Sequence, residues 1–378
     1  MKKVPKVALL IETSNSYARE LLHGVRAWVR EHGPWSIRLT EQGRGAAVPT
    51  WLKGWDGDGV IARVENERIA RELRATGLPV IDVSAALPRL VFPRVATDAE
   101  GAATLAATHL IERGLRNFAY CGDGRFHWAR QRGEAFARAT AMVGRCVQFT
   151  PTLGAVDDEV KEIARWLRTL PRPVGVLASL DLRGQQVLAA CRLVGLAVPD
   201  DVAVIGVHND ELLCELCDPP LTSVIPDAPR AGYVAAELLA RKMKGRRLAV
   251  RLHEIAPLGV AARQSTDVGA VGDAKIAGAV RFMRQQAAGG ANVGDVLRAV
   301  PMARTALERR FKAALGTTPH AHLRKLRIER VKDLLARTSL PVGEIATATG
   351  FEHPEYLSAM FRRECGVTPR EFRARFRR

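Results

Sequence analysis

The chain has 378 residues, and its 57 lysines and arginines against 40 aspartates and glutamates give a formal net charge of +17. Hydrophobic residues make up 47% of the chain and aromatic residues 6%, which excludes disordered and collagen-like polypeptides and suits two or three folded domains. A positive excess of this size argues against an ordinary acidic enzyme, because it usually accompanies a polyanionic partner.

The basic residues are concentrated at the C-terminal end. Residues 273–378 hold 21 lysines and arginines against 10 acidic residues, a net charge of +11, which leaves +6 for the 272 residues before them. This distribution predicts a nucleic-acid-binding domain after a larger, nearly neutral domain.

The N-terminal segment predicts the compartment. The apolar run 7–11 is too short for a signal peptide, and no run approaches the roughly 18–20 apolar residues of a membrane span. The six cysteines are scattered, so a disulfide framework is not expected. We therefore expect a cytoplasmic protein that does not contact membranes.

Residues 4 to 265 alternate short apolar runs with amphipathic stretches. The expected strands are 7–11, 59–61, 80–83, 118–121, 174–178 and 202–207. The expected helices are 17–32, 66–76, 100–113, 128–142, 156–170 and 182–193. Buried strands joined by crossover helices indicate parallel α/β sheets, and six such units fit two similar lobes better than one sheet.

Polar side chains and one aromatic ring follow the expected strand ends, where open parallel sheets bind ligands. This mixture of groups suits a neutral polyol such as a sugar. The candidate ligand-binding residues are Ser14, Asn15, Trp128, Arg130, Asp181, His208 and Asn209. Other roles stay open: Asp181 or Asn209 could cap a helix, Trp128 could belong to the core, and Arg130 could join the lobes by a salt bridge.

A change of pattern follows residue 266. Residues 267–273 (DVGAVGD) are glycine-rich and aperiodic, which predicts a linker between a domain of residues 1–266 and an all-α domain of residues 274–378. There, Asn292 can cap a helix, and a second helix spans 303–315. The helix-turn-helix pattern recurs at 342–364, and a connecting helix over 323–335 separates the two copies.

These motifs resemble the arabinose-regulator (AraC) family of transcription activators. The segments LERRFK at 307–312 and GTTP at 316–319 are similar to the family's first recognition helix and its exit. The segments EIA at 344–346, GF at 350–351 and GVTPREF at 366–372 are similar to its second motif. The resemblance implies two helix-turn-helix motifs that bind tandem half-sites in promoter DNA, with RNA polymerase as a further partner.

Within this resemblance, one set of side chains faces the DNA. The candidate DNA-binding residues are Arg304, Thr305, Glu308, Arg309, Lys312, His353, Glu355, Tyr356, Ser358, Arg362 and Arg363. Arg309 could pair with guanine or contact only phosphate, and Lys312, Arg362 and Arg363 suit phosphate contacts. We expect Phe311, Phe351 and Phe361 in the core instead.

The first domain resembles the periplasmic-binding-protein fold of lactose-repressor (LacI) type sensors. The similarity lies in the spacing of Asp98 and Gly101, in the Arg130, Gly133 and Phe136 pattern, and in the segment PDDVAVIGVHND at 199–210. It implies a two-lobed sugar sensor that closes about hinges near 97–98, 224–225 and 256–257.

The pairing of such a sensor with an AraC-type domain resembles regulators of pentose catabolism, a match strengthened by DGDGVIA at 56–62 and RQSTD at 263–267. This resemblance implies xylose or a related pentose as the effector, and a different sugar or a sugar acid is the alternative. The chain departs from the pattern at His208, where an aspartate is expected. A neutral imidazole offers one donor and one acceptor, and could make binding pH-dependent near neutrality.

Enzymatic motifs are missing from the sequence. It contains no HExxH, GxSxG or phosphate-binding glycine loop, and its lone CxxC, Cys214 to Cys217, has no second pair and is interpreted as structural. We therefore expect no catalytic activity, no metal and no cofactor, and a homodimeric, sugar-switched transcription activator. The alternative of another class is a small-molecule-binding protein whose C-terminal domain binds proteins and not DNA.

The C-terminal charge generates the first prediction. A fragment starting at about Asp273 should bind duplex DNA with an affinity that falls steeply as salt rises, because lysine and arginine contacts release counterions from the phosphates. A titration over several salt concentrations measures the slope. Salt-insensitive binding, or none, would contradict the predicted DNA-binding domain.

Overall fold

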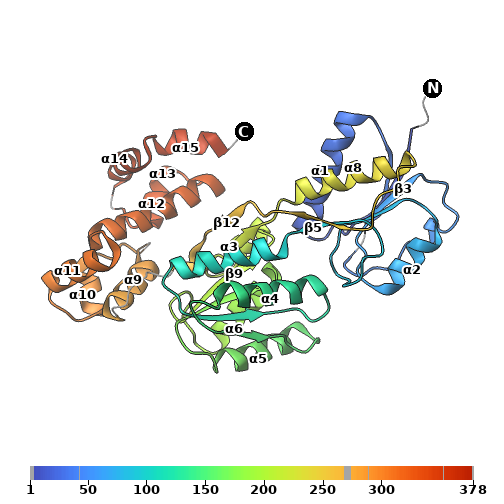
Figure 1. Ribbon diagram of the computed structural model, residues 1–378. Coiled ribbons are helices and arrows are strands. Elements are labelled where there is room, and N and C mark those ends of the chain that lie inside the picture. Colours follow the sequence, from blue (N-terminus) through green and yellow to red (C-terminus); the bar gives the residue numbers. More distant parts are fainter. Residues whose placement is uncertain (1–3, 42, 268–273, 288, 352, 377–378) are drawn as a thin grey trace. The chain divides into compact units, whose positions relative to one another are not determined.

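The computed structural model describes residues 4–41, 43–267, 274–287, 289–351 and 353–376. The chain divides into two compact units, residues 1–267 and 268–378. The linker expected at 267–273 lies, apart from Asp267, outside the described residues. The first unit consists of two α/β lobes, each built on a six-stranded sheet, and the second unit is helical (Figure 1).

The sheet of the first lobe is entirely parallel, in the order β11-β5-β4-β3-β1-β2. Its strands are β1 (Lys6–Leu10), β2 (Ser36–Leu39), β3 (Gly59–Ala62), β4 (Val80–Asp82), β5 (Arg94–Thr97) and β11 (Leu252–Ile255). Its helices are α1 (Ser16–His32), α2 (Glu67–Ala75) and α8 (Ala228–Met243), with a 3-10 turn at Thr50–Leu52. Alternate residues of β1 face opposite sides of the sheet, so that Val7 and Leu9 pack with α1 and α8, while Ala8 and Leu10 pack with α2.

The second lobe has the strand order β12-β10-β9-β8-β6-β7, and only the β10–β12 pair is antiparallel. Its strands are β6 (Asn117–Cys121), β7 (Cys146–Phe149), β8 (Val174–Ala178), β9 (Val202–Val207), β10 (Thr222–Ile225) and β12 (Gly259–Ala261). Its helices are α3 (Ala99–Glu112), α4 (His127–Thr140), α5 (Val156–Leu167), α6 (Asp181–Leu193) and α7 (Glu211–Leu216), with a 3-10 turn at Gln264–Thr266.

The chain passes between the lobes three times. The crossings join β5 to α3, β10 to α8 and β11 to β12, at residues 97–99, 225–228 and 255–259. These are the segments where the sequence predicts hinges. Each sheet is therefore completed by a strand that arrives late in the chain, β11 in the first lobe and β12 in the second.

Helices α1 and α8 lie unusually close together because both carry glycine at their contact. A Cβ added to Gly24 would lie 1.9 Å from the carbonyl oxygen of Pro229, and one added to Gly232 would lie 1.9 Å from that of Leu21. No larger side chain fits at either position without moving a backbone. This contact holds α1 against α8, and Tyr17 of α1 is buried in the core that the two helices share.

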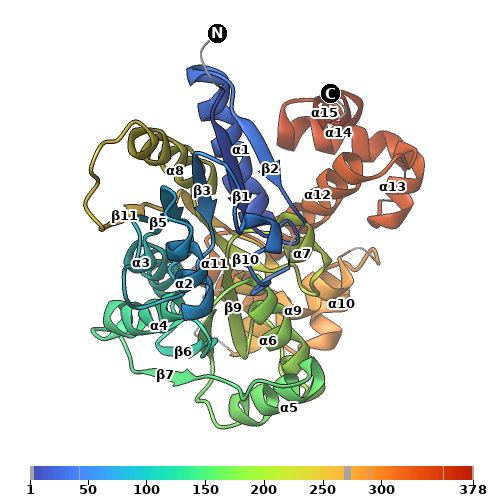
Figure 2. The same ribbon diagram turned by 90° about the vertical axis from the view of Figure 1, so that its right-hand side faces the viewer.

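The second unit contains seven helices among its described residues. They are α9 (Ala274–Gln286), α10 (Val293–Ala299), α11 (Arg304–Leu315), α12 (Pro319–Arg337), α13 (Val342–Ala348), α14 (Pro354–Cys365) and α15 (Pro369–Phe376). Helix α12 runs between the group α9–α11 and the group α13–α15 (Figures 1 and 2). Each group packs its own core on α12, around Phe311 in the first and Phe361 in the second, and Phe351 is buried as well. The expected core role of these three phenylalanines is confirmed.

All six expected strands and six expected helices of the first unit are present, with ends shifted by a few residues. The sequence did not predict β2, β5, β7, β10, β11, β12, α7, α8, α9 and α15. Strand β2 is exposed along its whole length, and β7, β11 and β12 are only partly buried. Their sequences therefore lack the continuous apolar run by which a buried parallel strand is recognised.

A buried ion pair joins α5 and α6 in the second lobe. Arg183 Nη1 lies 2.8 Å from Glu159 Oε2, and the two side chains are 4% and 10% exposed. The Arg183 guanidinium and further hydrogen bonds hold the pKa of the Glu159 carboxyl below its usual value of 4.5, against the opposing effect of burial.

Replacing Arg183 by glutamine should therefore lower the unfolding free energy of the first unit by about 1–3 kcal/mol. All six tryptophans lie in this unit, so urea unfolding followed by tryptophan fluorescence reports on it alone. A carboxyl group with a lowered pKa stabilises the fold above about pH 4.5, and this stabilisation is lost as the pH falls through the lowered pKa. The difference in unfolding free energy between the variant and the wild type should therefore shrink on acidification. Arg165→Gln, an exposed position on α5, is the control; an equal effect there would contradict the role of the pair.

Candidate functional site: an interlobe cavity and two DNA-reading helices

A cavity lies between the two lobes of the first unit. Its empty volume is about 430 Å³ when the open space at its mouth is included. The residues that line it are Tyr17, Arg63, Val83, Ser84, Ala85, Ala96, Thr97, Trp128, Arg132 and His208. In the first lobe most of them follow the carboxyl ends of β3, β4 and β5, as expected for parallel sheets.

Aromatic rings form one part of the wall. His208 stacks on Tyr17 with ring centroids 4.9 Å apart and lies 6.3 Å from the ring of Trp128. Trp128 in turn stacks on Phe126 at 5.4 Å. Tyr17 Oη is also 3.2 Å from Thr97 Oγ1. The cavity thus offers apolar ring faces beside hydroxyl groups, the combination that binds the two kinds of surface of a sugar.

The backbone at the end of β9 is strained where it reaches the cavity. His208 and Asn209 both have positive φ angles, 113° and 50°. Asparagine enters the left-handed region more readily than most residues, whereas a histidine at φ 113° is strained by about 1–3 kcal/mol, and such strain clusters at functional sites. Burial and the charges of Arg132, Arg44 and Arg63 hold the pKa of the His208 imidazole well below 6.5. The imidazole is therefore neutral at physiological pH, and the expectation that His208 titrates near neutrality is wrong.

Arg132 enters the cavity from α4 and is almost fully buried. Its Nη1 donates to the carbonyl oxygen of Ser179, and its guanidinium carbon lies 5.1 Å from the centre of the Trp128 ring. Its Nε has no hydrogen-bond partner in the structure. Asn15 Nδ2 and Ser179 Oγ are likewise buried without partners, which is unusual for polar groups in a folded protein.

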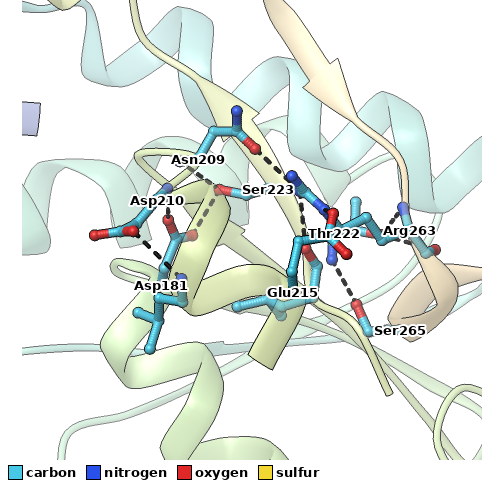
Figure 3. A network of polar contacts seen from close by, with 10 residues as sticks. Asp181, Asn209, Asp210, Glu215, Thr222, Ser223, Arg263 and Ser265 are labelled. Carbon is cyan, nitrogen blue, oxygen red and sulfur yellow. Dashed lines mark hydrogen bonds and ion pairs between the residues drawn. The ribbon is translucent and has the colours of Figure 1, made fainter. Parts of the chain in front are cut away.

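A polar network supports the strained turn from below (Figure 3). Asp181 accepts hydrogen bonds from Ser223 Oγ at 2.6 Å and from the Asp210 amide at 2.8 Å. The Asn209 amide donates to Ser223 Oγ at 2.9 Å, and Arg263 Nη1 donates to Asn209 Oδ1 at 3.0 Å. Burial raises the pKa of the Asp181 carboxyl to about 7, although these hydrogen bonds oppose the shift. Asp181 and Asn209 therefore hold the end of β9 in place.

The structure distributes the seven predicted ligand residues unevenly. Trp128 and His208 line the cavity. Ser14 and Arg130 are exposed outside it, Asn15 caps α1 by accepting from the Ala18 amide at 2.9 Å, and Asp181 and Asn209 belong to the supporting network.

Sequence reasoning missed the first-lobe residues Arg63, Ser84 and Thr97, and it selected Arg130 where Arg132 points inward. Arg63 directly follows β3, which is one residue longer than the expected strand 59–61. A search for polar residues just after strand ends could therefore have found it. Thr97 ends β5, a strand that was not expected, and the choice between two arginines on one helix depends on its rotation.

The cysteine pair of the second lobe lies in its hydrophobic core. Cys214 and Cys217 are buried free thiols, and burial raises the pKa of Cys217 to about 11 and that of Cys214 still further. Within the described part of the chain, no group of three potential metal-binding side chains occurs, and no helix is both long and apolar enough to cross a bilayer.

The second unit presents two helix-turn-helix motifs, α10–α11 and α13–α14. Both second helices end at a glycine in the left-handed region, Gly316 with φ 67° and Gly366 with φ 74°, which no other residue type adopts as readily. The candidate DNA-binding side chains of α11 are all exposed: Arg304, Thr305, Glu308, Arg309 and Lys312. On the second motif His353, Glu355, Tyr356, Arg362 and Arg363 are exposed and Ser358 is half-buried.

Not every basic residue of this unit is available to DNA. Arg327 on α12 donates to the carbonyl oxygens of Ala287 and Ala291, and Arg373 donates to that of Leu340. These arginines hold helices together. By contrast, Arg309 and Lys312 form no ion pair with any described residue and project freely from α11, while Arg304 pairs with Glu308 at 3.2 Å.

Two lobes around a lined cavity, joined to two helix-turn-helix motifs, define a ligand-responsive DNA-binding transcription regulator. Family models agree: residues 6–99 match a XylR N-terminal domain, residues 107–266 a periplasmic binding protein-like domain, and residues 296–375 a helix-turn-helix domain. The xylose operon regulatory protein of Escherichia coli (strain K12) is 31% identical over 97% of this chain and 96% of its own. The chain belongs to the family of xylose operon regulatory proteins.

Other relatives are consistent with this assignment. The xylose operon regulatory protein of Haemophilus influenzae is 28% identical over 97% of this chain and 98% of its own. A solved structure of a xylose-binding transcription activator, XylR, matches 99% of this chain and 98% of its own at 29% identity, with a TM-score of 0.83. A cellobiose complex of the regulator CelR matches 69% of this chain and 84% of its own at 22% identity with a TM-score of 0.55, a likeness of fold alone.

The exposure of Arg309 generates a prediction about sequence readout. Replacing Arg309 by alanine should cost about 1–3 kcal/mol at one base position of the preferred site and relax the preference there, if its guanidinium pairs with guanine. Lys312→Ala is the matched control on the same helix, and should weaken binding to all sequences alike. Uniform weakening by Arg309→Ala as well would show that Arg309 contacts only phosphate.

Proposed function

We propose that this protein activates genes of pentose catabolism and that a sugar in the interlobe cavity switches it. The cavity carries the proposal: it combines the Trp128 and Tyr17 rings with the hydroxyls of Ser84 and Thr97, and residues from both lobes line it. The names of the relatives make xylose the first candidate effector, since their operons and the similar solved structure are named for it.

The switch follows from the three crossings. A ligand that contacts Thr97 in one lobe and Trp128 in the other favours the closed arrangement of the lobes. It shifts the equilibrium between open and closed lobes only by the difference between its affinities for the two states. Closure alters the surface that the first unit offers to a second copy. We propose a homodimer whose DNA-binding domains then match two tandem half-sites and engage RNA polymerase. Such a regulator works beside the DNA in the cytoplasm and needs no catalytic activity.

An experiment on the full-length protein tests this function. Selection from random DNA duplexes, without ligand and with xylose or an acid of the same sugar class, should enrich a motif of two spaced half-sites more strongly when the effector is present. Trp128→Ala should keep the motif but lose the response, because the variant removes a cavity wall and leaves α11 and α14 unchanged. A response that persists in Trp128→Ala would contradict the cavity as the effector site. Absence of any enriched motif would favour a C-terminal domain that binds proteins.

A further inference from the structure

The cavity has an unbalanced charge. The His208 imidazole lies within the electrostatic reach of three guanidiniums, those of Arg44, Arg63 and Arg132. Two of the three have carboxylate partners: Arg44 Nε lies 3.6 Å from the Glu12 carboxylate, and Arg63 Nη2 lies 3.0 Å from the Glu65 carboxylate. Arg132 forms no ion pair with any residue that the structure describes. One cation in the site therefore lacks a counterion.

Arg132 is also the least solvated of the three. Its residue is only 3% exposed, and its one hydrogen bond goes to a neutral carbonyl, that of Ser179. The carboxyl group whose charge acts on it is that of Asp181, whose oxygens already accept from Ser223 and Asp210. A buried cation is costly unless an anion pairs with it, and a buried donor such as the free Nε costs further stability.

No residue of the lining can supply the anion. None of the ten lining residues is acidic. His208, which follows the end of β9 and stacks on Tyr17, is neutral, because burial and the charges of guanidiniums that include Arg132 lower the pKa of its imidazole. A neutral sugar would fill the space but would leave the guanidinium without a counterion.

We infer that the effector of this protein is a sugar acid, whose carboxylate binds the free Nε edge of Arg132 while its hydroxyls bind Ser84, Thr97 and His208. This inference rests on the proposed sugar-responsive function and specifies the chemical class of the ligand. A carboxylate matches the planar fork of a guanidinium and forms stronger hydrogen bonds to it than a hydroxyl does. The ligand then completes the charge balance that the protein leaves open.

Calorimetry of the full-length protein at neutral pH, with four sugars, tests the inference. Xylose, glucose and glucuronate share one ring and differ at a single carbon, which carries hydrogen, hydroxymethyl or carboxylate; xylonate places the carboxylate at the other end of the xylose skeleton. One of the two acids should bind on the order of ten- to a hundred-fold more tightly than its neutral counterparts, as expected for hydrogen bonds to a charged group.

Two variants assign the preference to named side chains. Arg132→Gln should remove the preference for the acid, and Arg130→Gln, the exposed arginine on the same helix, should leave it unchanged. His208→Asp gives Arg132 a carboxylate within the protein, so this variant should lose affinity for the acid and gain affinity for the neutral sugar. The gain keeps the test informative even if Arg132→Gln does not fold.

The outcomes separate the inference from the function on which it rests. If xylose binds as tightly as the acids, the inference is wrong and the proposed function stands. If glucose alone does, the inference and the assignment to pentoses are both wrong. If an acid is preferred but His208→Asp does not shift the preference towards the neutral sugar, the assignment to Arg132 is wrong. If none of the four binds, the proposed pentose-like effector is wrong, and the inference fails with it.

Discussion

The site depends on one topological constraint, the three passages of the chain between the lobes. Because β5, β10 and β11 each continue into the opposite lobe, the lobes are tied along one side and can separate only on the other. The cavity forms where the tied side meets the carboxyl ends of the strands, and Thr97 lies at a crossing itself. A ligand there acts directly on the segments about which the lobes would rotate.

The same topology explains which parts of the fold and site the sequence reveals. Central strands such as β8 and β9 are continuous apolar runs because both faces are buried, and the helix-turn-helix motifs carry local cap and core signals. Edge strands and the crossing strands carry no such signal. The sequence pattern therefore does not predict the strand that ends at Thr97, and it does not predict the contribution of this strand to the cavity.

The choice of individual ligand residues is limited by a different cause. Position at a strand end identifies a group of candidate ligand residues. Which of them face the cavity depends on the orientation of the helix that carries them, and on which side chains form hydrogen bonds to the backbone instead. Arg130 and Arg132 differ by two positions on α4, and one is exposed while the other is buried. Asp181 and Asn209 have the chemistry of sugar ligands, yet the strained turn at His208 uses both as supports.

The end of the first unit is fastened before the chain leaves it. Ser265 Oγ donates to the Val204 carbonyl at 2.6 Å and accepts from the Thr222 amide at 2.8 Å, and Thr266 Oγ1 lies 2.8 Å from His109 Nε2. All of these partners belong to the second lobe. The last turn of the first unit is thus tied to three elements of one lobe, α3, β9 and β10, so the folding of that lobe and the anchoring of the segment that leaves it depend on the same hydrogen bonds.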